Sequence, residues 1–599
     1  MSESASLWRL SCRWGRVRAA EPALFLRVLL LSCSMAFVTP AQLVGEEPDR
    51  AKDGSAEAVD EPGSPDRMRE MQSEAVRQQF AGWGHWGNQP EKFGTWTNHS
   101  NRLIPLYTFG MTLDPLRQAG SVYSDPESLE QLYGRLPEGT VNPFARYYDQ
   151  TDVYRLLQQA TDLGKRHLIV MVFDGMDWQT TRAAAVYRAG KVTYDTGRGS
   201  GLAFQDYRGT PTDFGFIVTS AALGGAAVDV DTQAIVRDPG PITGGLHPLR
   251  AGPMPWHEPT RSPYPLGLDR QLPHTVTDSA ASATSLFSGI KTYNGAINVD
   301  IEGKQVTPIA RQLQAEGYRV GVVTSVPVSH ATPAAGYANN VSRKDYQDLS
   351  RDLLGLPSVS HPEQPLSGVD VLIGGGWGEG GGRAPRQGEN FLPGNTYLHE
   401  SDLEAATAPD GHRRYVLAER TKGRDGTDVL NEATDLAVKE NRRLLGFFGT
   451  RGGHLPFQTA DGNFNPTFDV RGTERYTAGD VLENPTLAEM TRAALQVLAV
   501  PADGDGDSQP APFWLVVEAG DVDWANHANN LDNSIGAVLS GEAAFSAITD
   551  WVETNDAWDD TVLLLTSDHG HFLVLDDIEQ IADAGAAGRE GSGVASENP

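Results

Sequence analysis

Cysteine is almost absent from this sequence. Only Cys12 and Cys33 occur among its 599 residues, and both lie in the N-terminal segment 1–41. The rest of the chain therefore has no disulfide to stabilise it. From residue 42 onward, stability must come from a packed core and from bound metal ions.

Positive charge is also in short supply. The chain has 49 Lys and Arg against 78 Asp and Glu, which gives a net charge of -29. Binding to a nucleic acid requires clustered Lys and Arg, so we expect no nucleic-acid-binding surface. If such an acidic protein handles a phosphate group, metal ions or single arginines must supply the local positive charge.

Long apolar runs are missing. The run Ala23–Val38 contains Arg27 and is short for a membrane span, so we expect no stable transmembrane helix. A basic segment at residues 9–18 precedes the run, and small residues follow it. This pattern predicts an export signal over residues 1–41, and with it a periplasmic or extracellular protein. Lipid anchoring at Cys33 is a weaker alternative.

Changes in composition divide the rest of the chain. Residues 42–75 are charged and poor in aromatic side chains, which is typical of an acidic linker. Residues 76–160 contain several tryptophans and many turn residues, and we interpret them as an N-terminal extension of unknown role. The main domain is expected over residues 161–599, with a Gly- and Pro-rich insertion at residues 185–270.

Six short apolar runs in the main domain are typical of buried strands. Helical patterns separate several of them, for example at residues 308–316 and 486–499. This alternation predicts an α/β fold: a three-layer, doubly wound domain with a mostly parallel central sheet and helices on both faces. The six predicted strands are His167–Phe173, Arg319–Thr324, Val369–Ile373, Leu444–Phe448, Phe513–Val517 and Thr561–Leu565.

Three of these strands end in a carboxylate. Asp174, Glu518 and Asp568 each stand at or just beyond the end of an apolar run, and Asp568 is followed by His569 and His571. A single Asp in such a place is usually a helix cap or a turn residue. Because ligands bind beyond the carboxyl ends of parallel strands, three such carboxylates together indicate a functional site.

A metal site is the chemistry that these residues favour. Asp523 and His527 are four residues apart and would share one face of a helix. A carboxylate and an imidazole at this spacing suit tetrahedral zinc, although an ordinary Asp–His pair on a surface helix would look the same. With Asp568, His569 and Asp174 added, the set can hold two metals, as in enzymes that transfer phosphoryl groups.

Ser279 is the candidate nucleophile. It stands in the run Thr277–Thr284, which is rich in small residues and is also typical of a helix start capped by Asp278 or Thr277. The two interpretations are compatible, because a helix start directs N–H groups toward an anion. A serine hydroxyl needs activation, which a metal ion can supply.

The run Val276–Asp300 resembles the nucleophile segment of the alkaline phosphatases. Five other blocks resemble segments of the same family and occur in the same order, within about residues 165–575. They are Phe173–Met176, His330–Ala335 with Ser342–Lys344, Leu372–Gly376, Glu518–His527 and Thr566–His571.

This resemblance implies a metal-dependent phosphomonoester hydrolase that forms a phosphoserine on Ser279 and acts on small phosphomonoesters. The implied cofactors are Zn²⁺ at two sites and Mg²⁺ at a third. Arg343 would hold two phosphate oxygens, and His571 would support a metal ligand. The resemblance admits a homodimer. The implied ligands are Asp174, Asp568 and His569 for the first zinc, Asp523 and His527 for the second zinc, and Asp174, Thr332 and Glu518 for magnesium.

The sequence departs from the best-known bacterial pattern of the family at three places. His330 stands where an aspartate is common near the magnesium, and Trp524 stands where a lysine is common, so we expect weaker magnesium binding and an altered affinity for phosphate. Other members of the family carry the same pair, so it does not argue against activity. The family's second zinc normally takes a further histidine from a segment well after Asp568 and His569. No histidine follows His571 in this chain, which therefore resembles a member that is short at the C-terminus.

The missing ligand leaves two questions open. By residue type alone, the histidines that could replace it are His571, His454 and His274. If none does, the second zinc would bind weakly. The chain could then be a non-catalytic relative that binds phosphate or metal. A phosphodiesterase or a sulfatase-like hydrolase of the same superfamily is another alternative.

Overall fold

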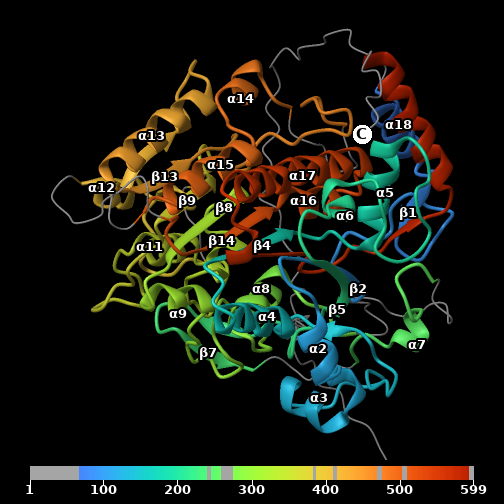
Figure 1. The fold of residues 1–599 in the computed structure, drawn as a ribbon, viewed down its shortest axis with the longest axis horizontal. Coiled ribbons are helices and arrows are strands. Elements are labelled where there is room, and N and C mark those ends of the chain that lie inside the picture. The colour runs from blue at the N-terminus through green and yellow to red at the C-terminus, as the bar shows by residue number, and fades with distance from the viewer. Residues whose placement is uncertain are drawn as a thin grey trace, which may run out of the picture. The chain divides into compact units, whose positions relative to one another are not determined.

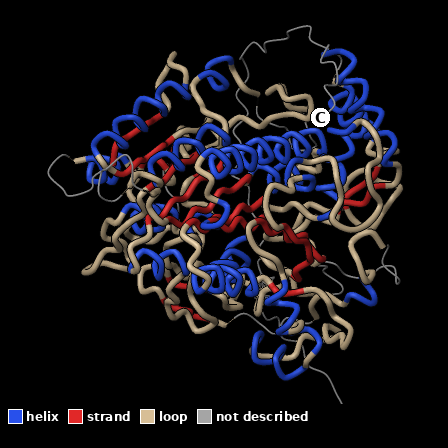
Figure 2. Tube along the Cα trace, in the orientation of Figure 1, coloured by secondary structure: helices blue, strands red, loops and turns tan. Residues whose placement is uncertain are grey.

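A ten-stranded mixed sheet runs through the centre of the protein in the computed structural model (Figures 1 and 2). The structure describes residues 66–238, 244–257, 274–381, 386–408, 415–467, 475–501 and 509–592. These all belong to one compact unit, Gly45–Pro599. The expected export signal, residues 1–41, lies outside the described residues.

Seven neighbouring strands of the sheet are parallel, from β12 to β15. β2 is antiparallel to both of its neighbours, and β3 is parallel to β5. All six strands predicted from apolar runs are present. In spatial order, the strands are β12 (Tyr415–Glu419), β13 (Arg443–Phe447), β9 (Val371–Gly375), β8 (Arg319–Pro327), β14 (Phe513–Ala519), β4 (His167–Phe173), β15 (Thr561–Thr566), β2 (Leu103–Phe109), β5 (Thr212–Val218) and β3 (Tyr148–Asp149).

Both faces of the sheet are buried, as the continuous apolar runs predict. Alternate side chains of β4 enter two different hydrophobic cores: Ile169, Met171 and Phe173 enter one, and Leu168, Val170 and Val172 enter the other. The predicted three-layer α/β fold is therefore confirmed.

Eight helices contribute buried side chains to the first of these cores, and seven contribute to the second. Three of them are short: Ala203–Asp206 and Asp521–His527 supply Phe204 and Val522 to the first core, and Asp114–Ala119 supplies Leu116 to the second. The other twelve form two groups of six, and their labelled members, apart from Glu400–Thr407, lie on opposite sides of the sheet in Figure 1. The first group is α1 (Arg67–Gln78), α5 (Trp178–Ala189), α13 (Gly426–Glu440), α15 (Leu487–Leu498), α17 (Leu531–Thr554) and α18 (Ile578–Ser592). The second group is α4 (Thr151–Asp162), α8 (Ser279–Ser288), α9 (Ile309–Ala315), α10 (Ala331–Ala335), α11 (Tyr346–Leu354) and α12 (Glu400–Thr407).

The remaining described elements are short. Three two-stranded ribbons lie outside the main sheet, and β1 with β16 joins an early segment to a late one. The ribbon strands are β1 (Gly84–Trp86), β16 (Leu573–Leu575), β6 (Ala227–Asp229), β7 (Ala234–Arg237), β10 (Gly380–Gly381) and β11 (Gly394–Asn395). The helices are α2 (Asp114–Ala119), α3 (Pro126–Tyr133), α6 (Ala203–Asp206), α7 (Pro248–Ala251), α14 (Ala478–Leu482), α16 (Asp521–His527) and the 3₁₀ turns Val122–Ser124 and Trp558–Asp560.

The structure differs from the expected division of the chain. β2 and β3 belong to the segment interpreted as an N-terminal extension, residues 76–160, yet both are strands of the central sheet. β2 pairs with β15 along Leu563–Thr566, so the sheet has no boundary at residue 161. Pro105 lies inside β2, and because proline is rare in central strands, its presence hides this strand from pattern reasoning.

Two other expected boundaries also differ. β5 lies within the expected insertion, residues 185–270, and joins the central sheet beside β2. The last residues of the expected linker, 67–75, form the start of α1. Met68, Gln72 and Ala75 are buried there at helical spacing, so this segment is packed against the fold.

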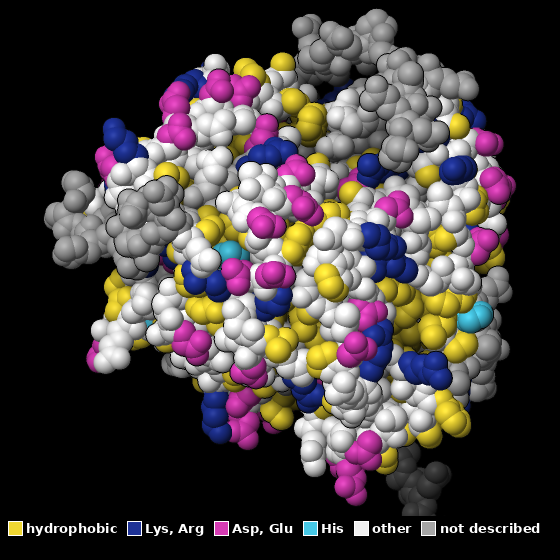
Figure 3. Space-filling model, viewed as in Figure 1, with side chains coloured by type: hydrophobic (Ala, Val, Ile, Leu, Met, Phe, Trp, Pro, Cys, Tyr) yellow, Lys and Arg dark blue, Asp and Glu magenta, His cyan; other side chains and the backbone are white. Residues whose placement is uncertain are grey.

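The surface carries charges of both signs. Figure 3 shows Lys and Arg side chains in small groups, separated by acidic and neutral side chains, on the face in view. Among the residues that the structure describes, no helix has the length and apolar character needed to span a bilayer.

Replacing Leu106 by Ala tests whether β2 is an integral strand. Leu106 is fully buried in β2, so Leu106→Ala should lower the free energy of unfolding by about 2–5 kcal/mol. Denaturant unfolding followed by tryptophan fluorescence measures this. The control is Leu136→Ala, at a leucine that is 47% exposed and should change stability little. If residues 76–160 were a detachable extension, Leu106→Ala would leave the main transition unchanged.

Candidate metal and phosphate site

The carboxylates predicted at strand ends meet at one edge of the sheet. β14, β4 and β15 are adjacent, and they carry Glu518, Asp174 and Asp568 at or just beyond their carboxyl ends. All three side chains are at most 1% exposed. Burial and the nearby carboxylates of Asp568 and Asp523 raise the pKa of Asp174 well above its usual range. Without a bound cation, such closely spaced buried carboxyl groups must take up protons, so the arrangement suits a metal site.

The first cluster that could hold a metal consists of Asp174, Asp523 and His569. His569 Nε2 lies 3.4 Å from Asp174 Oδ1 and 3.2 Å from Asp568 Oδ2. Asp568 is oriented by the N–H groups of Gly175 and His569, which donate to its Oδ1 at 2.9 Å. Burial holds the pKa of His569 well below its usual range, so its imidazole is neutral and can act as a ligand.

Ser279 faces this first cluster. Its Oγ lies 3.2 Å from Nε2 of His569, and the side chain is buried. Ser279 is the first residue of α8, whose N-cap is Asp278; the Asp278 carboxylate accepts a hydrogen bond from the N–H of Ala281. The predicted nucleophile therefore lies at the predicted capped start of the helix. The exposed N–H groups of such a start attract an anion.

The second cluster consists of His99, Asp523, His527 and His571. Asp523 and His527 lie on α16, as their spacing predicts, with 3.4 Å between Oδ1 of Asp523 and Nε2 of His527. His571 Nε2 lies 2.7 Å from Asp523 Oδ1, a distance that suits a hydrogen bond to the carboxylate. His571 therefore lies where it can orient Asp523.

His99 is the residue of this site that sequence reasoning misses. It lies in the segment between β1 and β2, and its ring stacks on that of His569 with 3.6 Å between the centroids. Its spacing to the other site residues gives no signal, because the chain between them is several hundred residues long. Of the three histidines considered as replacements, His571 is in the cluster, whereas His454 stacks on Phe457 and His274 lies beside Gly244.

Backbone carbonyl groups hold the rings of His99 and His527. Nδ1 of His99 lies 2.8 Å from the carbonyl oxygen of Thr277, and Nδ1 of His527 lies 2.7 Å from that of Thr97. If each Nδ1 carries the proton, each Nε2 presents a lone pair. The two Nε2 atoms face each other at 3.2 Å. Two converging lone pairs beside a carboxylate form a donor set that fits a divalent cation such as zinc.

Gly175 permits the two clusters to approach. It has a φ of +74°, and a Cβ at this position would lie 2.7 Å from Nε2 of His571 and 3.0 Å from Cα of Asp523. A side chain here would therefore displace the residue shared by both clusters.

The expected magnesium ligands also lie together. Burial raises the pKa of Glu518 to about 7, against the lowering effect of the hydroxyl groups of Thr324 and Thr332. Oε1 of Glu518 and Oδ1 of Asp174 are buried and make no hydrogen bond to another described residue. Buried carboxylate oxygens without partners fit a hard cation.

Arg343 lies beside the start of the nucleophile helix. Its Nη1 donates to Oδ2 of Asp278 at 3.1 Å, while its Nε is buried without a hydrogen-bonding partner among the described residues. The guanidinium therefore has a donor left for an anion. His330 and Trp524 contact each other, with 5.8 Å between ring centroids. Burial holds the pKa of His330 well below its usual range, so it adds no positive charge.

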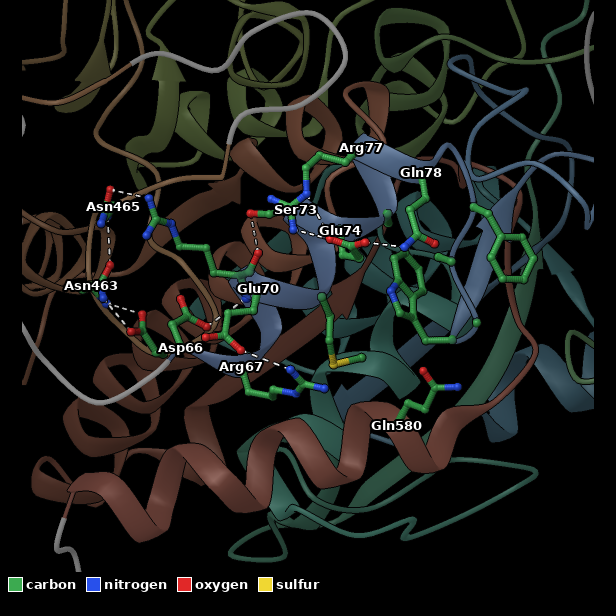
Figure 4. A pocket seen from close by; sticks show the side chains of 18 residues that line it. Asp66, Arg67, Glu70, Ser73, Glu74, Arg77, Gln78, Asn463, Asn465 and Gln580 are labelled. Carbon is green, nitrogen blue, oxygen red and sulfur yellow. Dashed lines mark hydrogen bonds and ion pairs between the residues drawn. The ribbon is translucent and has the colours of Figure 1, made fainter.

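A cavity of about 920 Å³ lies elsewhere. Its lining comes from α1, from the loop around Asn463 and from Gln580 of α18 (Figure 4). None of the site residues named above lines it, so its size is no guide to the chemistry.

His99→Ala should weaken metal binding at the second cluster. Loss of a residue that only hydrogen-bonds to a metal ligand lowers metal affinity roughly 10–100-fold. We expect the affinity for Zn²⁺ or Co²⁺ to fall by more than this. Titration of metal-stripped protein by calorimetry measures it. The control is His399→Ala, at a histidine that caps α12 and is remote from both clusters. Equal affinities for His99→Ala and wild type would contradict the assignment.

The contribution of Glu518 to the stability of the metal-free protein should fall between acid and neutral pH. Folding raises the pKa of Glu518 from 4.5 to about 7, so its proton is held in the folded state. Stability from this group is fully present below pH 4.5 and is lost as the pH rises through about 7, a change of about 3 kcal/mol. Urea unfolding of chelator-treated protein at pH 5 and 7 measures it. Glu518→Gln should remove this part of the pH dependence; an unaltered dependence in the variant would contradict the prediction.

The sequence is similar to those of known alkaline phosphatases. Alkaline phosphatase 3 of Bacillus subtilis is 27% identical over 297 residues, 49% of this chain and 49% of that protein. Alkaline phosphatase of Escherichia coli K12 is 30% identical over 51% of this chain and 61% of its own length. The chain thus spans about half the length of the first of these relatives.

Among solved structures, a cold-active alkaline phosphatase from Shewanella is 23% identical over 68% of each chain, with a TM-score of 0.38. A family model described as alkaline phosphatase matches residues 265–584, which is more than half of the sequence. The chain belongs to the alkaline phosphatase family.

Proposed function

We propose that this protein hydrolyses phosphomonoesters through a phosphoserine on Ser279 and releases inorganic phosphate. The observation that carries the proposal is the position of Ser279: its Oγ lies at the start of α8 and 3.2 Å from His569, which belongs to a cluster that could hold a metal. Family membership supports the same reaction class.

In the proposed reaction, Oγ of Ser279 attacks phosphorus and the alcohol leaves. Water then attacks the phosphoserine, which frees the serine and yields phosphate. The N–H groups at the start of α8 and the guanidinium of Arg343 hold the phosphate oxygens. Asp278 fixes that guanidinium through the 3.1 Å hydrogen bond. Because the fork of arginine is planar, it can bind two oxygens at once.

The residues proposed to bind metals fall into three sets. Bound zinc ions would stabilise the negative charge that develops on the serine oxygen, on the leaving oxygen and on the attacking water. Ser279, the clusters and Arg343 together form a site for phosphate. The proposed ligands are Asp174, Asp568 and His569 for a first zinc, His99, Asp523 and His527 for a second, and Asp174, Thr332 and Glu518 for magnesium.

The position of His99 makes the non-catalytic alternative less favourable. The non-catalytic alternative depends on a missing ligand at the second zinc, and His99 lies where that ligand is needed. A phosphodiester has two non-bridging oxygens and a phosphomonoester has three, so the guanidinium of Arg343 fits both and does not separate these substrates. Family membership is what favours the monoester. The comparison of p-nitrophenyl phosphate with its bis-ester separates these two substrate classes, and we expect faster hydrolysis of the monoester.

Ser279→Ala tests the nucleophile. It should reduce kcat on p-nitrophenyl phosphate by on the order of 10³-fold or more, and acid quenching with labelled phosphate should trap phosphoserine in the wild type alone. The matched control is Ser285→Ala on the same helix, because the Ser285 hydroxyl donates to the carbonyl of Ala281, within the helix itself. Full activity in Ser279→Ala, or a faster rate on the bis-ester, would reject the proposal.

A further inference from the structure

A buried amide links the nucleophile helix to the segment that carries Asp568. Gln150 is fully buried just before α4. Its Nε2 donates to the main-chain oxygen of Asp568 at 2.7 Å and to Oγ of Ser282. Oγ of Ser282 also donates to that oxygen, at 2.9 Å. Ser282 is one turn beyond Ser279 on α8. The amide of Gln150 therefore bonds both to the helix that carries Ser279 and to the segment that carries Asp568 and His569.

Lys291 determines which way this amide points. Its Nζ donates to Oε1 of Gln150 at 3.3 Å. Lysine has donors and no acceptor, so the amide oxygen must face Lys291 and the NH₂ group must face Asp568 and Ser282. In the opposite orientation, the NH₂ group of the amide would face the ammonium group of Lys291, and the amide oxygen would face the main-chain oxygen of Asp568. Neither contact would then be a hydrogen bond.

A buried ion pair keeps Lys291 in place. Nζ of Lys291 lies 3.0 Å from Oδ2 of Asp149, and both side chains are fully buried. The ring of Tyr133 lies 5.3 Å from the same Nζ. The hydroxyl groups of Tyr123 and Tyr133 donate to Oδ2 of Asp149, and the N–H of Thr151 donates to its Oδ1. A buried pair with its hydrogen bonds satisfied adds little stability over apolar packing, but it is well suited to specify one arrangement.

We propose that Gln150 is a positioning residue: oriented by Lys291 and Asp149, it fixes the separation between α8 and Asp568, and hence the approach of Ser279 to His569. This rests on the proposed role of Ser279. Asp568 is the residue whose Oδ1 binds the N–H of His569. A shift of its main chain would therefore move the Asp568 carboxylate and also the imidazole of His569, which lies 3.2 Å from Oγ of Ser279. A misplacement of about 1 Å can cost about 10²-fold in rate.

Two substitutions at residue 150 separate positioning from packing. Gln150→Met keeps the length and removes every hydrogen bond. Gln150→Glu keeps an oxygen for Lys291 but puts a second oxygen against the Asp568 carbonyl. For both variants we expect kcat on p-nitrophenyl phosphate to fall about 10–100-fold, with KM changed less than about threefold. Gln158→Met on an exposed position of α4 is the matched control and should leave kcat unchanged.

Two further readouts do not depend on turnover. In metal-free protein, amide hydrogen exchange of residues 566–571 should be faster in both variants than in wild type. In cobalt-substituted protein, the visible spectrum should shift. If the wild type had no phosphatase activity, the proposed function would fail, and these two readouts would still decide whether Gln150 positions Asp568.

The outcome that would overturn the proposal is a folded Gln150→Met protein with kcat within twofold of wild type, unchanged exchange over residues 566–571 and an unchanged cobalt spectrum. Should the residue-150 variants fail to fold, Ser282→Ala provides the test. It removes one of the two bonds to the Asp568 carbonyl, so exchange over residues 566–571 should still increase, and no increase would count against the proposal.

Discussion

The constraint on which the site depends is the burial of several carboxylates at one edge of the sheet. Asp174, Glu518, Asp523 and Asp568 are all at most 6% exposed. The rest of the local structure can be understood as a response to this negative charge. Burial holds the pKa values of His99 and His569 well below their usual range, so these two imidazoles are neutral and can act as ligands. Arg343 brings a permanent cation to the start of α8, and the carboxylates are left with oxygens for metal ions.

Much of this arrangement could be predicted from residues alone. Continuous apolar runs identify the six central parallel strands, because only a strand buried on both faces has no polar side. The carboxylates that follow β4 and β15 and end β14 then fall at one sheet edge. For the same reason Asp523 and His527 could be placed together: four residues on a helix make one turn, and the pair indeed lies on α16.

The parts that could not be predicted depend on long-range pairing. Nothing local marks His99 as a ligand, because its partners Asp523 and His527 are brought to it only by the folded sheet. Because Pro105 lies in β2, the sequence pattern does not predict this strand. The pairing of the N-terminal segment with β15 could therefore not be predicted either. The sequence also gives no sign of the contacts of Gln150, since a glutamine before a helix is usually a surface residue. Its contacts depend on a lysine and a carbonyl group far along the chain.

The position of His99 also sets an order of events during protein synthesis. His99 leaves the ribosome early, whereas His527 follows 428 residues later and His571 later still. A growing chain therefore holds one imidazole of the second cluster long before its partners exist, and closing so long a loop is slow. A nascent or truncated chain cannot complete this metal cluster. The complete set of side chains in the second cluster thus exists only in finished molecules, a property that no local motif could provide.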